Sequence, residues 1–169
     1  MTSPDKSDLF LTVIEGHKGI IHKIALAYAD NKEAKEDLVQ EIVLQLWKSF
    51  DNYNPQFKYS TWIYRVALNV SLAASRKENN RAKRIDPLRE EMLSVAQTEE
   101  STTLEEHYKK LQEFIFGLKE LDRAIMLLYL EEKSQKEMAE IMGMSPTNIS
   151  TRIGRIKDVL RQKFAELPQ

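Results

Sequence analysis

The sequence predicts an all-α protein: two small helical domains joined by a flexible linker, the second containing a helix-turn-helix. Apolar residues recur at intervals of three and four along most of the chain, which is typical of amphipathic helices. No stretch sustains the alternation of apolar and polar residues that marks a half-buried strand. Between residues 77 and 101 the helical period stops and the composition turns polar. We therefore place domains at residues 8–78 and 103–167, with the linker at residues 79–102.

Two amphipathic helices are predicted at the start of the first domain. The first spans residues 8–29, and its buried face is expected to carry Phe10, Ile14, Ile21, Ile24 and Tyr28. Asp30 and Asn31 can cap the second helix, and Glu33 resembles the acid of a capping box that begins at Asp30. The second helix covers about residues 32–50, and its core stripe is expected to be Val39, Ile42, Val43, Leu46 and Phe50.

A turn-rich loop over residues 51–59 separates the second helix from a third. The segment reads DNYNPQFKY, and its Asp, Asn and Pro residues are turn signals. It also carries three aromatic residues. Ser60 can cap a helix over about residues 61–77. The inward face of this helix is expected to carry Ile63, Val66, Ala67 and Val70.

Beyond the linker, in which a helical piece is predicted near residues 87–95, the second domain opens with two helices. Thr103 and Glu106 have the spacing of a capping box and begin a helix that runs to about Gly117. A strongly apolar helix over residues 121–131 follows.

Residues 134–160 have the layout of a helix-turn-helix. Ser134 and Glu137 form a third capping box, and Ser145 followed by Pro146 is a specific signal for a helix start. One face of the last helix is expected to pack on the helix before it, through Ile149, Ile153, Ile156 and Leu160 against Met138, Ala139 and Met142.

The opposite face of the last helix is the first candidate binding site, with DNA as its ligand. Arg can donate two hydrogen bonds to guanine, Ser and Thr reach bases or phosphates, and the first turn offers free N–H groups to a phosphate. The face carries Ser150, Thr151, Gly154, Arg155, Lys157 and Arg161, with Arg152 at its edge and Asn148 in the first turn. An ordinary solvated helix face is the alternative; the turn and the cap in register favour DNA.

The first domain contains two further candidate faces. Helical spacing places Asp37, Gln40, Glu41 and Leu44 together, and this acidic face with an apolar centre is either a docking surface or simply solvated. On the third helix, Trp62, Arg65, Asn69 and Arg76 share an arc, next to Tyr53, Phe57, Lys58 and Tyr59 of the loop. Aromatic and basic residues together are typical of single-stranded nucleic-acid binding. For Trp62 we favour a place in the core, and for Lys58 and Tyr59 a contact with DNA.

Composition limits the functions and partners that the sequence allows. The 169 residues include no cysteine, so disulfides and thiolate metal sites are excluded and a reducing cytoplasm is expected. There is no signal-peptide pattern, and no apolar run approaches the roughly 20 residues of a membrane helix, so no membrane insertion is expected. The net charge of −1 means that nucleic-acid binding must depend on local charge. Residues 133–163 hold seven basic and three acidic residues, and residues 30–41 five acids and two lysines, which indicates two different partners.

Three segments occur in an order and spacing that belong to one protein family. They are DLVQEIVLQLW at residues 37–47, FKYSTWIYRVALNV at residues 57–70, and the C-terminal stretch at residues 118–160. Together they resemble bacterial sigma factors, in particular the small extracytoplasmic-function (ECF) group of the sigma-70 family. DLVQE and the STWIYR–N pattern are specific in combination.

The resemblance implies a sigma factor that binds core RNA polymerase and directs promoter-specific initiation of transcription. It implies that Asp37, Gln40 and Glu41, with Leu44 on the same face, dock on the coiled coil of the largest polymerase subunits. It implies that residues 57–76 melt and read the −10 element, with Tyr53 and Asn69 around an extruded base. It implies that Ser150, Thr151, Arg152, Gly154 and Arg155 read the −35 element, although Ser150 stands where arginine is frequent. An anti-sigma factor is a further partner implied by the resemblance.

Catalysis by this chain is not expected. His17, His22 and His107 are scattered, and there is neither a Gly-rich phosphate loop nor a cysteine nucleophile, so we expect no cofactor and no metal. Two other functions stay open at this point. One is a stand-alone DNA-binding regulator whose first domain senses a ligand or dimerises, and the other is a structural adaptor whose C-terminal helix pair only packs.

Overall fold

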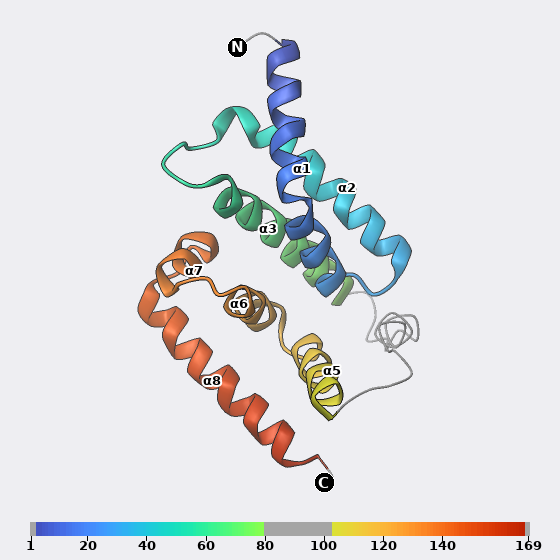
Figure 1. The fold of residues 1–169 in the computed structure, drawn as a ribbon, viewed down its shortest axis with the longest axis vertical. Helices are drawn as coiled ribbons and strands as arrows, with labels where there is room; N and C mark the ends of the chain where they lie inside the picture. Colours follow the sequence, from blue (N-terminus) through green and yellow to red (C-terminus); the bar gives the residue numbers. More distant parts are fainter. Residues whose placement is uncertain (1–2, 80–102, 168–169) are drawn as a thin grey trace. The chain divides into compact units, whose positions relative to one another are not determined.

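A computed structural model describes residues 3–79 and 103–167 of the chain. These described residues form helices and no strand, and they divide into two compact units, one within residues 1–84 and one within residues 85–169 (Figure 1). We call them the N-terminal unit and the C-terminal unit. The all-α, two-part fold is therefore confirmed. The helical piece expected near residues 87–95 lies outside the described residues.

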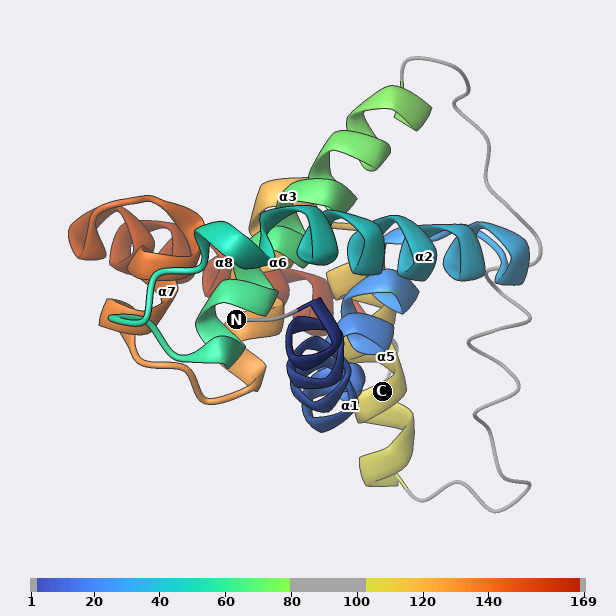
Figure 2. The same cartoon turned by 90° about the horizontal axis from the view of Figure 1, so that it is seen from above.

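The N-terminal unit is a bundle of three helices. Its elements are α1 (Ser3–Tyr28), α2 (Lys32–Ser49), the short 3₁₀ helix η1 (Phe50–Asn52) and α3 (Tyr59–Asn79). Figure 2 shows α1 close to end-on with α2 and α3 beside it, and each helix contacts the other two. The core between them is formed by Ile21, Ile24, Ile42, Leu46, Ile63 and Leu68.

The predicted core stripes of this unit were right in part. Most of the expected residues are buried, but Ile14, Val39, Val43, Val66 and Val70 are only half-buried. Their neighbours Val13, Leu38, Tyr64 and Leu68 are buried instead. Each helix packs against two partners, so its most buried line runs between them. The half-buried valines lie about one residue to the side, on the walls of the grooves between helices.

α2 begins at the predicted residue, Lys32, whereas α3 begins two residues earlier than predicted, at Tyr59. Asn31 is the N-cap of α2, because its Oδ1 accepts a hydrogen bond of 2.7 Å from the N–H of Ala34. Asn31, and not Asp30, is thus the cap, and the residue three positions after it is Ala34, so the capping box expected from Asp30 and Glu33 does not begin this helix. In α3 the N–H of Trp62 donates to the carbonyl of Lys58 at 3.2 Å, so Ser60 lies inside the first turn and is not the cap.

The C-terminal unit contains four described helices. They are α5 (Thr103–Phe116), α6 (Glu120–Leu130), α7 (Gln135–Met142) and α8 (Pro146–Ala165). Arg123 is buried and donates to the carbonyls of Phe116 at 2.7 Å and Leu118 at 3.2 Å, which fixes the turn between α5 and α6. The rings of Phe114 and Phe164 meet edge to face at 5.0 Å and join α5 to α8.

The predicted helix-turn-helix, α7 and α8, has the expected caps. Ser134 accepts from the N–H of Glu137 and Ser145 from that of Asn148, each at 3.1 Å. Gly143 ends α7 with a φ of 67°, a left-handed conformation that glycine adopts at low cost. The expected core row of α8 is buried, namely Ile149, Ile153, Ile156 and Leu160. On α7 the buried residues are Met138 and Ile141, whereas Ala139 and Met142 are half-buried.

Among the described residues, no helix has both the length and the apolar character needed to cross a membrane. The same residues contain no group of three or more His, Asp or Glu side chains arranged to hold a metal ion.

Candidate functional site

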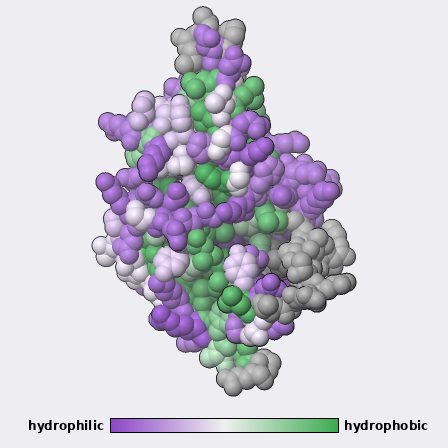
Figure 3. Space-filling model, in the orientation of Figure 1, coloured by the Kyte–Doolittle hydropathy of each residue, from purple (hydrophilic) through white to green (hydrophobic). Residues whose placement is uncertain are grey.

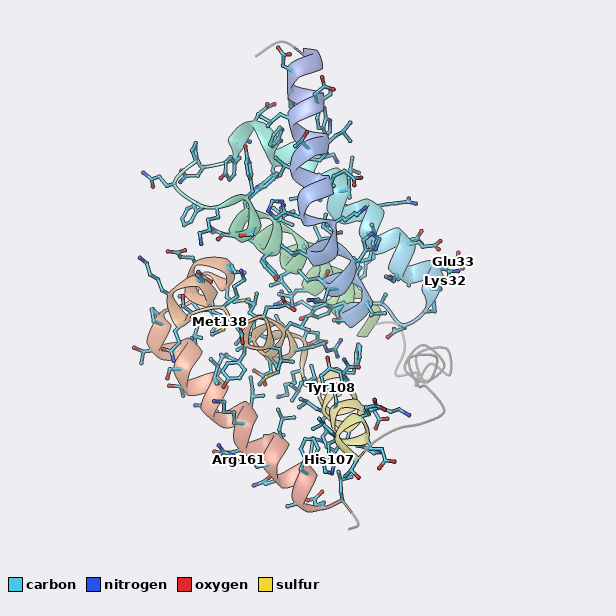
Figure 4. The ribbon with its side chains drawn as sticks, viewed as in Figure 1. Lys32, Glu33, His107, Tyr108, Met138 and Arg161 are labelled. Carbon is cyan, nitrogen blue, oxygen red and sulfur yellow. The ribbon has the colours of Figure 1, made fainter. Side chains whose placement is uncertain are left out.

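The acidic face predicted on the second helix is an exposed surface of α2. Asp37, Gln40 and Glu41 are exposed. Leu44, one turn further along the same side of the helix, is 43 % exposed. Gln45 donates to the carboxylate of Glu41 at 3.1 Å, which orders that side chain along the helix. Lys32 and Glu33 project from the first turn of the same helix (Figure 4). The structure thus brings the four predicted residues onto one accessible face.

An open groove of about 620 Å³ between α1 and α2 adjoins this face. Its walls include Leu11, Gln40, Leu44 and Trp47, and Leu11 is 59 % and Trp47 36 % exposed. Leu11 and Trp47 were not among the predicted residues of this face, although Trp47 lies three residues after Leu44 and therefore on the same side of the helix. Apolar patches among hydrophilic residues are visible on the face of the molecule drawn in Figure 3. Because Gln40 and Leu44 belong both to the acidic face and to the lining of the groove, the acidic face is continuous with an apolar groove.

Trp47 is held in place by its neighbours. Its ring packs edge to face on Phe10 with centroids 5.0 Å apart, and Lys6 lies with its Nζ 4.3 Å from the ring centroid. The same Lys6 ammonium pairs with Asp51 at 2.9 Å. These contacts order the exposed indole before any partner binds.

Three aromatic side chains gather where the loop joins α3. Tyr53 stacks on Tyr59 with centroids 4.5 Å apart and 20° between the planes, and Trp62 lies 5.4 Å from Tyr53 and 6.4 Å from Tyr59. The Tyr53 hydroxyl donates to the carbonyl of Phe57. Burial, and secondarily the neighbouring Tyr59, raises the pKa of Tyr53 above its ordinary value of 10.0. We call Tyr53, Tyr59 and Trp62 the aromatic cluster.

Trp62, for which the sequence favoured a place in the core over a contact with DNA, is partly in the core and partly accessible. One side packs on Phe50 at 5.8 Å, yet the side chain is only half-buried. Lys58, Arg65, Asn69 and Arg76 are all exposed, on the loop and along α3. The aromatic cluster thus begins a polar and basic face, which can offer stacking planes and phosphate contacts to an unpaired strand.

The face of α3 also borders α2. Asn69 and Lys77 line an open groove of about 550 Å³ together with Glu41 and Gln45. The apolar part of its lining consists of Val66, Val70, Ala73 and Ala74, all from α3. The predicted docking residue Glu41 and the predicted DNA residue Asn69 therefore lie on opposite walls of one groove.

The predicted DNA face of α8 is exposed for most of its length. Asn148, Ser150, Thr151, Gly154 and Arg155 are all accessible. Thr151 donates its hydroxyl to the carbonyl of Thr147 at 3.0 Å. Because Ser145 satisfies only one N–H of the first turn, the remaining N–H groups there can still meet an anion.

Three basic residues of α8 already have partners in the C-terminal unit. Arg152 is half-buried and pairs with Asp122 at 3.4 Å, and Lys157 lies over the ring of Tyr129 at 4.5 Å. Arg161 pairs with Asp158 at 3.3 Å, but both are exposed and Arg161 extends into solvent (Figure 4). Of the arginines in the first three turns, Arg155 is the accessible one in the part of the chain that the structure describes.

Comparison with protein families gives two matches, one for each unit. Residues 13–81 match sigma-70 region 2, and residues 108–160 match sigma-70 region 4. The ECF RNA polymerase sigma factor SigW of Bacillus subtilis is 24% identical over 170 residues, covering 95% of this chain and 91% of SigW. The RNA polymerase sigma factor SigS of Staphylococcus aureus is 30% identical over 141 residues, covering 83% of this chain and 88% of SigS.

Two solved structures share the fold. CnrH in complex with the cytosolic domain of CnrY has a TM-score of 0.69 and 20% sequence identity, covering 95% of this chain and 91% of that chain. The sigma factor RpoE from Bartonella quintana, in complex with the anti-sigma factor NepR, has a TM-score of 0.64 and 16% identity, covering 97% of this chain and 99% of that chain. At these identities the likeness concerns the fold.

Proposed function

Because this chain belongs to the sigma-70 family, in its extracytoplasmic-function group, we propose that its two helical units divide promoter recognition between them. The chain is a transcription initiation factor that directs RNA polymerase to specific promoters, and it is not an enzyme. We assign docking and the −10 element to the N-terminal unit and the −35 element to the C-terminal unit. The observation that carries this division is that regions 2 and 4 match separate compact units. Membership of the sigma-70 family favours this function over a stand-alone regulator and over a structural adaptor.

The polymerase docks on α2 in this proposal. Asp37, Gln40 and Glu41 supply the polar contacts, and Leu44 contributes an apolar centre that is already exposed. The adjoining groove lets an apolar side chain of the polymerase reach Leu11 and Trp47. A polar surface with a small apolar centre is typical of interfaces between separately folded partners.

The −10 element is melted and read by the aromatic cluster and by α3. Tyr53, Tyr59 and Trp62 offer ring faces on which unpaired bases can stack, and Asn69 offers an amide to a base edge. Lys58, Arg65 and Arg76 are exposed and can neutralise the phosphates of the same strand.

The −35 element is read in duplex form by α8. Ser150, Thr151 and Arg155 face the major groove, Asn148 and the first turn hold a phosphate, and Gly154 allows close approach. Because this face presents few free cations, the affinity of the chain alone for DNA is low and most of it comes from the polymerase.

We place this activity in the cytoplasm, where core polymerase and promoter DNA are found. An anti-sigma factor is a third partner. Its support is that the two solved structures of similar fold are complexes, one of them with a named anti-sigma factor.

Run-off transcription with purified core polymerase tests the proposal. Initiation at a defined promoter is expected only when the chain is added. The double variant Asp37→Arg/Glu41→Arg is expected to lose co-purification with core polymerase while keeping its helical circular dichroism. A matched control, Asp158→Arg/Glu166→Arg, reverses two exposed acids at the end of the C-terminal unit and is expected to co-purify normally. Undiminished co-purification of the first variant would refute the docking assignment.

A further inference from the structure

Arg152 differs from the other residues of the −35 face that the sequence predicts. Its side chain is only 33 % exposed, and its Nη1 lies 3.4 Å from Oδ1 of Asp122, which is 28 % exposed. The two residues are separated by 30 positions in the sequence and join α8 to α6. The Nε of Arg152 is fully buried and has no hydrogen-bond partner among the described residues. The guanidinium therefore faces the interior of the C-terminal unit as much as the solvent.

The position of Arg152 on its helix explains this burial. Residue 152 precedes the buried Ile153 and lies one turn before the buried Ile156, so its stem runs along the margin of the core. Ser150, Thr151 and Arg155 point to the accessible side of the same turns. To reach a base edge, Arg152 would have to leave Asp122 and expose a side chain that is now two-thirds buried.

We propose that Asp122 and Arg152 form a positioning pair that fixes the tilt of α8 on α6 and withholds Arg152 from base reading. The inference rests on the proposed role of α8 at the −35 element. Asp122 is then a positioning residue for promoter recognition although it lies outside the helix-turn-helix. Arg155, which is more exposed than Arg152, reads the DNA.

A small set of variants in the full chain, assayed as holoenzyme with core polymerase, tests the pair. Initiation is measured on two promoters that differ only in an intact or a scrambled −35 element. Asp122→Ala and Arg152→Ala are each expected to lower the −35-dependent part about threefold, as for loss of a half-exposed ion pair. The double variant is expected to be no worse than either single variant. The reversed pair Asp122→Arg/Arg152→Asp is expected to restore most of the loss.

Base preference distinguishes positioning from direct reading. Initiation is scored on promoters with every single substitution in the −35 element. For Arg152→Ala we expect weaker use of all sequences with the same preferences, whereas Arg155→Ala is expected to relax the preference at one position. Isosteric Asp122→Asn serves where Asp122→Ala loses helical structure, and Asp122→Glu is expected to retain most activity.

Two results would overturn the pair. One is Asp122→Ala without any loss of −35 use. Unchanged use would mean that the pair contributes nothing to recognition, and increased use would mean that a freed Arg152 helps DNA binding. The other is Arg152→Ala with relaxed preference at a single base pair and no rescue by the reversed pair. A different result would refute the proposed function itself. If Arg155→Ala leaves −35 use unchanged, the assignment of α8 to that element is wrong, and the positioning role is refuted with it.

Discussion

Tyr53 and Tyr59 stack with their ring centroids 4.5 Å apart at the two ends of the loop that leads into α3. The hydroxyl of Tyr53 also donates to the carbonyl of Phe57, inside the same loop. The loop is therefore closed by its own side chains. The ring of Trp62 packs beside the pair, with its centroid 5.4 Å from that of Tyr53. A surface for unpaired bases that is ordered in advance loses less entropy when a strand binds.

Removing a ring from this stack is expected to impair DNA opening. Tyr59→Ala deletes one stacking plane and leaves Tyr53 unsupported, and stacking of a base on an aromatic side chain is worth about 1–3 kcal/mol. We expect at least a fivefold drop in the open complex, measured by permanganate reactivity of thymines in the −10 element. Tyr53→Phe keeps the ring but loses the bond to Phe57, so a smaller drop is expected. Tyr108→Ala, an exposed aromatic on α5, is the control and is expected to be neutral.

The raised pKa of Tyr53 predicts a pH dependence of stability. Burial favours the neutral phenol in the folded chain, so the folded-state pKa lies above the unfolded value of 10.0. The stability that depends on this proton is fully present below pH 10.0 and is lost as the pH rises through the folded-state pKa. Thermal unfolding from neutral to strongly alkaline pH measures this loss, and Tyr53→Phe is expected to reduce it. An identical alkaline loss in Tyr53→Phe would contradict the assignment.

The helix-turn-helix could be predicted in detail because its signals are local. Ser134 and Ser145 bind backbone N–H groups three residues away, and Gly143 acts on its own φ angle. The sequence left open whether Asp30 or Asn31 caps α2, because both have the same capping chemistry and only the path of the backbone chooses between them.

Features that depend on the packing of distant segments could not be predicted. Periodicity locates an apolar stripe on α2, but the neighbours α1 and α3 decide that Leu38 is buried and Val39 is on a groove wall. The groove beside Leu44 requires Leu11 from another helix. In the same way, helical spacing puts Arg152 at the edge of the DNA face, and only the position of Asp122 on α6 shows that its guanidinium is already paired.

Ser71 is a site where a substitution is expected to stabilise the N-terminal unit. Its side chain is 0% exposed, and its hydroxyl has no hydrogen-bond partner among the described residues. A buried hydroxyl without a partner costs about 1–3 kcal/mol. Ser71→Ala is therefore expected to raise the free energy of unfolding by up to about 1 kcal/mol in a urea titration.

Ser49 provides the matched comparison for Ser71. Its hydroxyl donates to the carbonyl of Gln45 at 2.9 Å, so Ser49→Ala removes a bond that is made. We expect no gain in stability for Ser49→Ala. If Ser71→Ala also fails to stabilise the protein, its hydroxyl has a partner that the described residues do not provide.

Gly154 tests whether the backbone of α8 comes close to DNA. It occupies the middle of a helix, where glycine is less favourable than alanine by about 1 kcal/mol. A Cβ added there meets no atom within 4 Å, so packing inside the protein does not require glycine. If DNA approaches this point, the added methyl group obstructs it. We therefore expect Gly154→Ala to stabilise the C-terminal unit by about 0.5–1 kcal/mol and to lower −35-dependent initiation.

The comparison with Gly16 separates the two effects of that methyl group. Gly16 lies in α1 with equally open space, so Gly16→Ala is expected to bring a similar gain in stability to the N-terminal unit. It is expected to leave −35 use unchanged, since we assign the reading of that element to α8. Thermal unfolding and run-off transcription on intact and scrambled −35 promoters measure both effects for both variants. Full −35 use by a stabilised Gly154→Ala protein would mean that the groove tolerates a side chain there, and that Gly154 is a position of weak readout and not of close approach.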